Sequence, residues 1–297
     1  MYAVSLLRLL PSVWVRALVS SARLFDLRRA VQLAHVEAGL PQPLVGQRVL
    51  EAGSDAGLSL FPLALRGAVV TGVDRDPGDI AVARHLARAL RVLDAQFQVA
   101  TLNSLPFRGR SFDIVIAAEA LDRADDDVGA LKELARVLRV GGLLALTVDA
   151  ADRGQTLVNL LPHRWLRPVR PCRRFSATDL RQKLELLGFE VVDTAPCLTG
   201  VGAIALDAFA RVRALDPATP RGRVLYSLLS PLLYMPAVLS DALGQGRRGY
   251  GLRVFAVRRS DTGAPPHANG NGHGLSLKYT TALEQPTQAI AGRALAR

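Results

Sequence analysis

The sequence contains little cysteine, and its two cysteines lie apart. Cys172 and Cys197 belong to no Cys-x-x-Cys motif and to no Cys/His cluster among the 297 residues. This spacing argues against a disulfide framework and against a structural zinc site. We therefore expect a reduced, cytoplasmic setting and no bound metal.

Lysine is also nearly absent. Lys132, Lys183 and Lys278 are the lysines of the chain, so arginine supplies nearly all of the positive charge behind the net charge of +11. Such a charge favours anionic surfaces, whether nucleic acid, acidic lipid or a phosphorylated substrate. However, aromatic residues make up 5% of the chain, and none of the basic runs is interleaved with them as in many nucleic-acid-binding proteins. Nucleic acid is therefore the weaker candidate partner.

Long uncharged hydrophobic runs are missing from the N-terminal thirty residues. Arg8, Arg16 and Arg23 interrupt the apolar residues of this segment at roughly helical spacing, and Pro11 breaks the helical pattern. This predicts a pair of amphipathic helices rather than a secretory signal or a membrane span. The two helices either cover the following domain or lie on a membrane surface.

From residue 47 onward, short apolar strands alternate with helical patterns. The strands are expected at 48–53, 68–76, 97–101, 112–119, 143–150, 189–195 and 252–259, and helices at 77–90, 126–138 and 176–187. This alternation predicts right-handed crossovers and a mostly parallel sheet. We divide the chain into an N-terminal helical extension (1–46), an α/β domain (47–260) with a helical insert or lid at about 200–250, and a polar, disordered tail (261–297).

The stretch "VLEAGSDAGLSL" (49–60) follows the first strand. Parallel sheets bind ligands at the carboxyl ends of their strands, where glycine lets the backbone approach the ligand and a helix start offers free N–H groups. Gly53 and Gly57 are four residues apart, with Asp55 midway. Dinucleotide-binding loops place a glycine five residues after the first, where this chain has Leu58. The spacing therefore argues against NAD or FAD.

The loop resembles the first motif of the class I S-adenosylmethionine-dependent methyltransferases, acidic-x-Gly-x-Gly-x-Gly, with Asp55 in place of the middle glycine. Three further similarities follow in the family's order: the second strand ending at Asp74, Leu105–Phe107 with Ser111–Asp113, and the helix–Gly141–Gly142–strand unit. The resemblance covers about 48–194. It implies a Rossmann-like, mostly parallel seven-stranded sheet with helices on both faces, and S-adenosyl-L-methionine as cofactor.

The resemblance also implies a set of cofactor-binding residues. They are Glu51, Gly53, Ser54, Asp55, Gly57, Asp74, Arg75, Thr101 and Leu102. Asp74 would bind both ribose hydroxyls, and the Leu102 backbone N–H would reach adenine. Thr101 replaces an acid that accepts a hydrogen bond from the adenine amino group. The Asp55 side chain either meets the positive charge of the cofactor or turns to solvent, and a lost site is the third alternative.

The acceptor side is less defined. His35, His163 and Glu119 are the candidate bases. His163 is alternatively a surface histidine among arginines, and Glu119 alternatively helps to position the cofactor or the loop. The segment 117–122 lacks the proline-containing loop of many base-methylating enzymes, and Arg123 stands where many relatives have histidine.

The segment "VLYSLLSPLLYMPAVLS" (224–240) has no charge but contains Pro231 and Pro236. It predicts a lid, a buried helix pair or a hairpin in the membrane interface, because a single span would separate two strands expected in one sheet. Together with the N-terminal helices, it favours contact with a membrane surface and a lipophilic or membrane-derived acceptor.

We therefore expect methyl transfer to an oxygen or carbon of a small lipophilic molecule. One alternative is a catalytically degenerate protein of the same fold that acts as a binding or membrane-associated module. Another is a methyltransferase of tRNA or protein, which the net charge favours.

Overall fold

The computed structural model describes residues 27–92, 94–152, 173–200, 203 and 249–260. The expected helices before residue 27, His163, the 224–240 segment and the tail after residue 260 lie outside the described residues. The described residues therefore comprise the α/β domain and the helix that precedes it.

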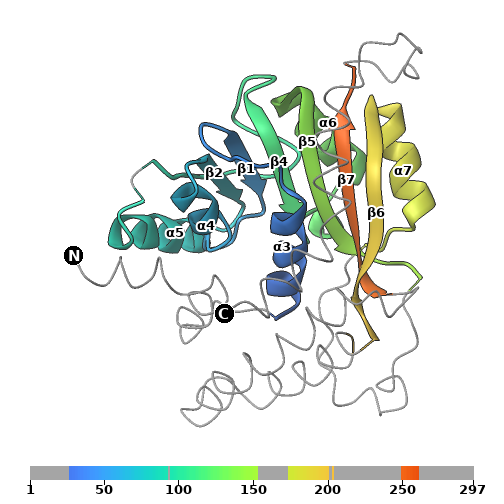
Figure 1. Ribbon diagram of the computed structural model, residues 1–297, viewed down its shortest axis with the longest axis horizontal. Coiled ribbons are helices and arrows are strands. Elements are labelled where there is room, and N and C mark those ends of the chain that lie inside the picture. The colour runs from blue at the N-terminus through green and yellow to red at the C-terminus, as the bar shows by residue number, and fades with distance from the viewer. Residues whose placement is uncertain (1–26, 93, 153–172, 201–202, 204–248, 261–297) are drawn as a thin grey trace.

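Seven strands form one sheet in the order β3-β2-β1-β4-β5-β7-β6 (Figure 1). Their bounds are β1 Arg48–Ala52, β2 Val69–Asp74, β3 Gln96–Val99, β4 Phe112–Ala118, β5 Leu138–Asp149, β6 Phe189–Thr199 and β7 Gly249–Arg258. The strands from β3 to β5 pair in parallel, whereas β7 is antiparallel to both of its neighbours. The predicted mostly parallel seven-stranded sheet is confirmed.

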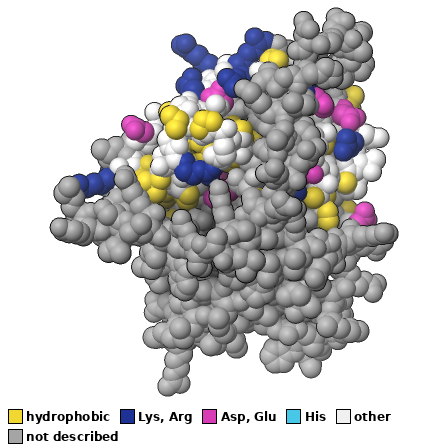
Figure 2. Space-filling model, in the orientation of Figure 1, with side chains coloured by type: hydrophobic (Ala, Val, Ile, Leu, Met, Phe, Trp, Pro, Cys, Tyr) yellow, Lys and Arg dark blue, Asp and Glu magenta, His cyan; other side chains and the backbone are white. Residues whose placement is uncertain are grey.

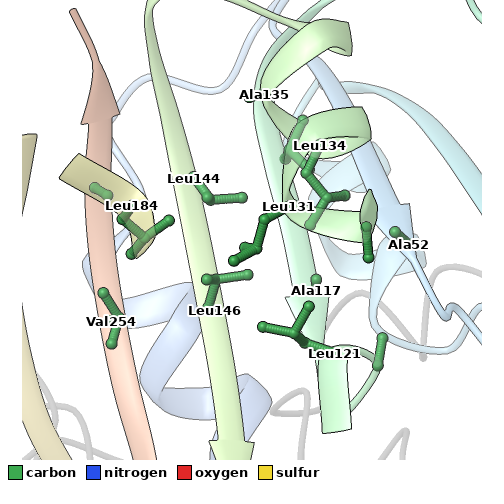
Figure 3. Packing of buried hydrophobic residues seen from close by; sticks show 14 of the residues in the cluster. Ala52, Ala117, Leu121, Leu131, Leu134, Ala135, Leu144, Leu146, Leu184 and Val254 are labelled. Atoms are coloured by element: carbon green, nitrogen blue, oxygen red, sulfur yellow. The ribbon is translucent and has the colours of Figure 1, made fainter. Parts of the chain in front are cut away.

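Helices cover both faces of the sheet (Figure 1). They are α3 Leu27–Gly39, α4 Leu60–Leu65, α5 Pro77–Ala89, η2 Leu121–Arg123, α6 Asp127–Val137 and α7 Ala177–Leu186. One hydrophobic cluster joins buried residues of α3, α4 and α5 to the sheet, and a second joins those of α6 and α7. In the second cluster, Leu131 and Leu134 of α6 pack toward Leu144 and Leu146 of β5 (Figure 3).

Capping side chains and a proline mark the starts of two helices. The Asp76 carboxylate accepts a hydrogen bond from the Gly78 backbone N–H at 2.7 Å, and Pro77 occupies the first helical position of α5. At the start of α7, the Ser176 hydroxyl accepts a bond from the Asp179 backbone N–H. After α7, Gly188 has a φ of +81°, which suits glycine at a helix end.

Strand β5 begins earlier than the sequence pattern indicates. We expected a strand from residue 143, after a helix that ends at 138, but the strand begins at Leu138, which pairs with Phe112. A register shift follows between Phe112 and Ile114, opposite the part of β5 that contains Gly141 at a φ of +78°. A bulge of this kind keeps both ends of the strand paired, which residue periodicity alone cannot indicate.

Strands β6 and β7, which flank the 224–240 segment in the sequence, pair with each other in one sheet, as expected. Thr199 pairs with Gly249, so the chain leaves β6 and enters β7 at the same edge of the sheet. Gly251 in turn pairs with Asp149 at the carboxyl end of β5. Within the described residues, no helix has the length and apolar character needed to cross a membrane.

A charged cluster connects α6 to the chain before α7 and to α7 itself. Asp127 lies 2.5 Å from Arg173 and 2.8 Å from Lys183, measured between carboxylate oxygens and side-chain nitrogens. Lys183 also contacts Asp179 at 3.0 Å and lies over the Phe175 ring. Partial burial works to raise the pKa of Asp127, but the hydrogen bond from Lys183 and the charges of Lys183 and Arg173 outweigh it and lower this pKa.

Replacing Asp127 by asparagine is expected to lower the free energy of unfolding by about 1–2 kcal/mol near neutral pH. Because the folded-state pKa is lowered, the carboxylate stabilises the fold fully above its ordinary value of 3.8 and loses this effect as the pH falls through the lower folded value. The difference between wild type and variant should therefore be constant from pH 7 to 5 and shrink below about pH 4. Urea unfolding at each pH, with the exposed Asp94→Asn as control, measures it. A difference that grows on acidification would contradict this assignment.

Candidate functional site

A cleft of about 210 Å³ opens at the carboxyl edge of the sheet. Its lining consists of Arg29, Gly53, Asp55, Asp74, Arg75, Asp76, Asp79, Ala100, Thr101, Leu102, Asn103, Glu119, Ala120, Arg123, Ala124 and Asp125. The strand order reverses here, since β2 lies on one side of β1 and β4 on the other. This is the position at which open parallel sheets bind ligands.

Both glycines of the loop have a positive φ and a close neighbour where a Cβ would lie, but the neighbour differs between them. Gly53 has a φ of +80°, and a Cβ on it would lie 2.6 Å from the Ala120 Cβ, so a side chain has no room there. A Cβ on Gly57, at a φ of +74°, would meet the Phe97 ring. The loop therefore fits closely against the end of β4 on one side and against the hydrophobic core on the other.

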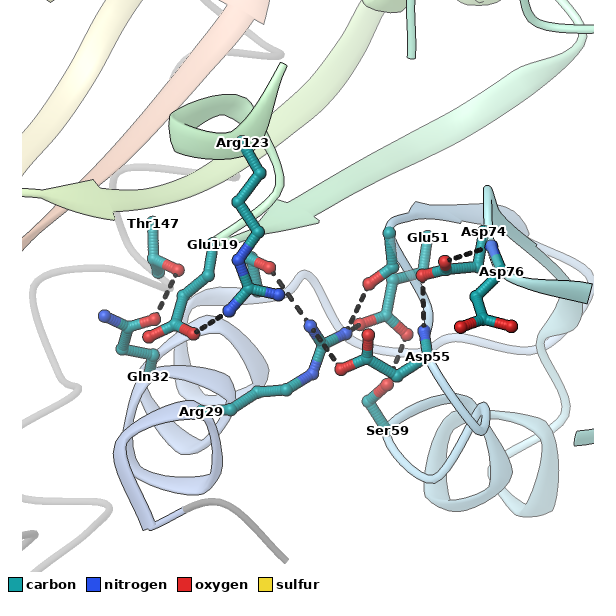
Figure 4. Close-up of polar contacts among 12 residues, drawn as sticks. Arg29, Gln32, Glu51, Asp55, Ser59, Asp74, Asp76, Glu119, Arg123 and Thr147 are labelled. Atoms are coloured by element: carbon teal, nitrogen blue, oxygen red, sulfur yellow. Dashed lines mark hydrogen bonds and ion pairs between the residues drawn. The ribbon is translucent and has the colours of Figure 1, made fainter. Parts of the chain in front are cut away.

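Asp74 holds the loop in position. Its carboxylate oxygens accept hydrogen bonds from the backbone N–H groups of Asp55 at 3.0 Å and Asp76 at 2.9 Å (Figure 4). Asp74 is 8% exposed and lines the cleft. Because a carboxylate has about four acceptor positions, it can take further bonds from hydroxyl groups of a ligand.

Arg29, from the first turn of α3, inserts its guanidinium between the loop and β4 (Figure 4). Its Nη2 donates to Glu51 Oε1 at 2.9 Å and to the Gly53 carbonyl at 2.6 Å. Its Nη1 lies 3.2 Å from the Ala118 carbonyl and 3.0 Å from Asp55 Oδ2. Burial opposes the charge, but Asp55 and Glu51 outweigh it and raise the pKa of Arg29. The wall of the cleft therefore carries a permanent cation.

The cleft is acidic on balance, in contrast to the chain as a whole. Its described lining includes six acids (Asp55, Asp74, Asp76, Asp79, Glu119, Asp125) but only three arginines (Arg29, Arg75, Arg123). Burial, followed by the charges of Asp55, Asp76 and Asp74, raises the pKa of Asp79. Lys and Arg side chains are spread over the face in Figure 2, at its upper margin and also at its left and right sides. The described part of the cleft therefore suits a cation better than a polyanion.

Glu119 follows β4 with an unusual backbone conformation. Its φ is +54°, which a residue other than glycine rarely adopts outside special positions. Its backbone N–H donates to the Thr147 carbonyl. The residue is 4% exposed, and a carboxylate oxygen lies 3.4 Å from an Arg123 guanidinium nitrogen. This conformation turns a buried carboxylate toward the cleft.

The predicted cofactor residues and Glu119 fall into two groups. Gly53, Asp55, Asp74, Arg75, Thr101, Leu102 and Glu119 line the cleft. Three others, Glu51, Ser54 and Gly57, lie behind the lining. Glu51 is fully buried and bonds to Arg29 and the Ser59 hydroxyl, whereas Ser54 turns its Oγ toward Gly72.

His35 lies away from the cleft lining, and His163 lies outside the described residues. His35 is 5% exposed, and its Nδ1 lies 3.5 Å from an Arg253 nitrogen between α3 and β7. Of the three candidate bases, Glu119 is the described one that lines the cleft.

Arg29 is not among the site residues that the sequence predicts. The available signal was a polar residue at the spacing of a buried helical stripe, because Arg29, Gln32 and Val36 stand at positions i, i+3 and i+7 of α3. Gln32 and Val36 are both buried, and Gln32 accepts a bond from the Thr147 hydroxyl at 2.9 Å. The stripe shows that this face is buried, but not that its first residue reaches the glycine loop.

Residues 50–146 match the methyltransferase domain family. The chain is 32% identical over 172 residues to aklanonic acid methyltransferase DauC of Streptomyces sp. (strain C5), an alignment that covers 50% of this chain and 78% of that one. It is 38% identical over 104 residues to the ubiquinone biosynthesis O-methyltransferase of Methylocella silvestris, covering 35% of this chain and 40% of that one. The chain thus spans less than half of the second relative.

Solved structures agree in fold. The [4+2]-cyclase SpnF superposes with a TM-score of 0.56 at 20% identity, covering 77% of this chain and 82% of that one. Geranyl diphosphate methyltransferase gives 0.50 at 15% identity, covering 80% and 86%. At such identities the likeness concerns the fold, and the different activities in these two names show that the fold alone does not determine the reaction. The ordered motifs, their meeting at one cleft and the match over 78% of DauC together place the chain in the class I S-adenosylmethionine-dependent methyltransferase family.

Proposed function

We propose that this protein transfers a methyl group from S-adenosylmethionine to an oxygen or carbon of a small, lipophilic acceptor. The observation that carries the proposal is the cleft, which brings Gly53, Asp74 and Thr101–Leu102 together from three separate turns of the sheet. These are the turns that the family resemblance assigns to the cofactor.

The donor groups of the cleft fit this cofactor. Asp74 offers carboxylate oxygens for hydroxyl groups, and Thr101 and Leu102 offer a hydroxyl and a backbone N–H at the position assigned to adenine. When bound, S-adenosylmethionine supplies a methyl group on a positively charged sulfur. The acidic balance of the cleft favours such a cation through the summed field of its carboxylates.

The acceptor side begins at the end of β4. Methyl transfer needs a nucleophile held in line with the methyl group, and a hydroxyl nucleophile must also lose its proton. Glu119 is suited to take that proton on a carboxylate oxygen, because it lines the cleft beside the glycine loop. Arg123, 3.4 Å away and half exposed, would stabilise the carboxylate and orient an acceptor that carries negative charge.

The names of the relatives support a small acceptor. One concerns an O-methyltransferase of ubiquinone biosynthesis and the other a methyltransferase of aklanonic acid. An oxygen of a quinol-like or phenolic acceptor is therefore the first to test. We also propose that the N-terminal segment before residue 27 and the 224–240 segment contact the membrane surface, which flotation with acidic liposomes tests directly.

The test of the proposed function has two stages. Calorimetric titration of the full chain with S-adenosylmethionine and S-adenosylhomocysteine should give micromolar binding of both. Incubation with labelled S-adenosylmethionine and a panel of phenolic, quinol and carboxylic acceptors should then yield a singly methylated product, detected by mass spectrometry.

Two outcomes would redirect the assignment. No cofactor binding by the folded protein would favour the binding-module alternative. Cofactor binding together with a salt-dependent shift on tRNA, and no small-molecule product, would favour the nucleic-acid alternative.

A further inference from the structure

Asp55 makes an ion pair across the cleft wall. Its Oδ2 lies 3.0 Å from Arg29 Nη1, and its backbone has a φ of +45°. In the family pattern this position carries glycine, so the carboxylate is a feature of this chain. The Asp55 side chain is 42% exposed, whereas that of Arg29 is 12% exposed.

Arg29 does not depend on Asp55 for its position. Its other guanidinium nitrogen bonds to the buried Glu51 and to the Gly53 carbonyl, and Nη1 also reaches the Ala118 carbonyl. The helix that carries it is fixed as well, because Gln32 is bonded to β5 and the helix packs into the hydrophobic core. The guanidinium would therefore stay at the wall of the cleft if Asp55 moved away.

A fixed guanidinium at a ligand cleft binds carboxylates. Arginine presents several N–H donors in a planar fork that matches a carboxylate. The amino-acid end of S-adenosylmethionine carries one carboxylate, as does that of S-adenosylhomocysteine. The Asp55 carboxylate already contacts Arg29 Nη1, so a cofactor carboxylate that approached this nitrogen would meet Asp55 there.

We infer that Asp55 is an internal competitor for Arg29, which occupies the guanidinium in the free protein and must release it when the carboxylate of the cofactor binds. This inference rests on the proposed function. Asp55 is suited to the role because it lies on a loop and is partly exposed, so it can turn to solvent. The residue thereby lowers cofactor affinity and sets the concentration at which the site fills.

Removing the competing charge should tighten binding. Asp55→Asn keeps the size of the side chain and a residue type that tolerates the left-handed backbone. A partly exposed ion pair of this kind contributes a modest amount, so we expect dissociation constants for both ligands about three- to tenfold lower than in wild type. Calorimetric titration measures them, with the exposed Asp94→Asn, outside the cleft lining, as a matched control that should leave binding unchanged.

The pair of ligands separates this role from a direct contact with the positive sulfur. S-adenosylmethionine carries that charge and S-adenosylhomocysteine does not, whereas both carry the carboxylate. Competition for Arg29 predicts an equal gain for the two ligands in Asp55→Asn. Contact with the sulfonium predicts weaker binding of S-adenosylmethionine alone, and would overturn the inference.

A double-variant comparison identifies Arg29 as the group in competition. Arg29→Gln should weaken binding of both ligands, and adding Asp55→Asn to it should bring no further gain. If Arg29→Gln fails to fold because Glu51 loses its partner, Asp55→Gly, the residue of the family pattern, provides the second test and should also tighten binding. If wild type binds both ligands and neither Asp55 variant binds them more tightly, this inference is overturned while the proposed function stands. No binding by wild type or by Asp55→Asn overturns the proposed function and, with it, this inference.

Discussion

Asp74→Asn is expected to weaken binding of S-adenosylmethionine and S-adenosylhomocysteine by about 10- to 100-fold, because hydrogen bonds to a charged group each contribute about 1.5–3 kcal/mol. The substitution acts in two ways. It removes the charged acceptor that the family resemblance assigns to the ribose, and it weakens the hydrogen bonds from the Asp55 and Asp76 backbone N–H groups that hold the loop.

The neighbouring Asp76 provides a matched control for Asp74. It lies in the same cleft lining, and its side chain caps α5 through the Gly78 N–H. Asparagine is as good a capping residue as aspartate, so Asp76→Asn removes one negative charge without disturbing the helix. We expect its affinity to stay within about threefold of wild type, as for a surface charge. Equal losses in the two variants would show that Asp74 acts only through the general field of the cleft.

Gly53→Ala is expected to reduce the free energy of unfolding by about 3 kcal/mol and to abolish measurable cofactor binding. A φ of +80° disfavours any residue with a Cβ by roughly 1–2 kcal/mol. The added methyl group would also lie 2.6 Å from the Ala120 Cβ, and overpacking of this kind typically costs about 1–3 kcal/mol. Urea unfolding followed by circular dichroism, and the same calorimetric titration, measure the two effects.

Gly46 separates the two contributions. It has a similar φ of +74°, but a Cβ on it would meet no atom within 4 Å. Gly46→Ala should therefore show the backbone part alone, about 1 kcal/mol. Adding Ala120→Gly to Gly53→Ala removes the clashing atom and should recover part of the lost stability. A Gly53→Ala variant no less stable than Gly46→Ala would contradict the close approach of the loop and β4.

The charge distribution bears on the kind of substrate. The net charge of +11 suggests an anionic partner, yet the described cleft lining is acidic on balance. A polyanion would meet Asp55, Asp74 and Asp79 at that surface, and this disfavours nucleic acid as the group that enters the cleft. A small acceptor needs no such complementarity, since under the proposed function it would meet the cleft through a few atoms near Glu119 and Arg123.

The sequence by itself determined the order of the seven strands along the chain, the helices α5, α6 and α7, and the glycine loop. These features depend on residues a few positions apart: the Asp76–Pro77 start of α5, the Ser176 cap of α7, and the spacing of Gly53 and Gly57. Local hydrogen bonding and backbone preferences act at that range. The order of the family motifs along the chain then predicted which turns form the cofactor cleft.

Only the tertiary structure decided which residues the side chains of the site contact. Arg29 reaches Glu51 and Gly53 from 22 and 24 residues away, and Ala118 from 89 residues away. Such contacts depend on how α3 packs across the sheet, and no periodicity in the sequence encodes that distance. For the same reason the sequence did not decide whether the Asp55 side chain contacts the cofactor or solvent. The packing of α3 supplies Arg29 as its partner.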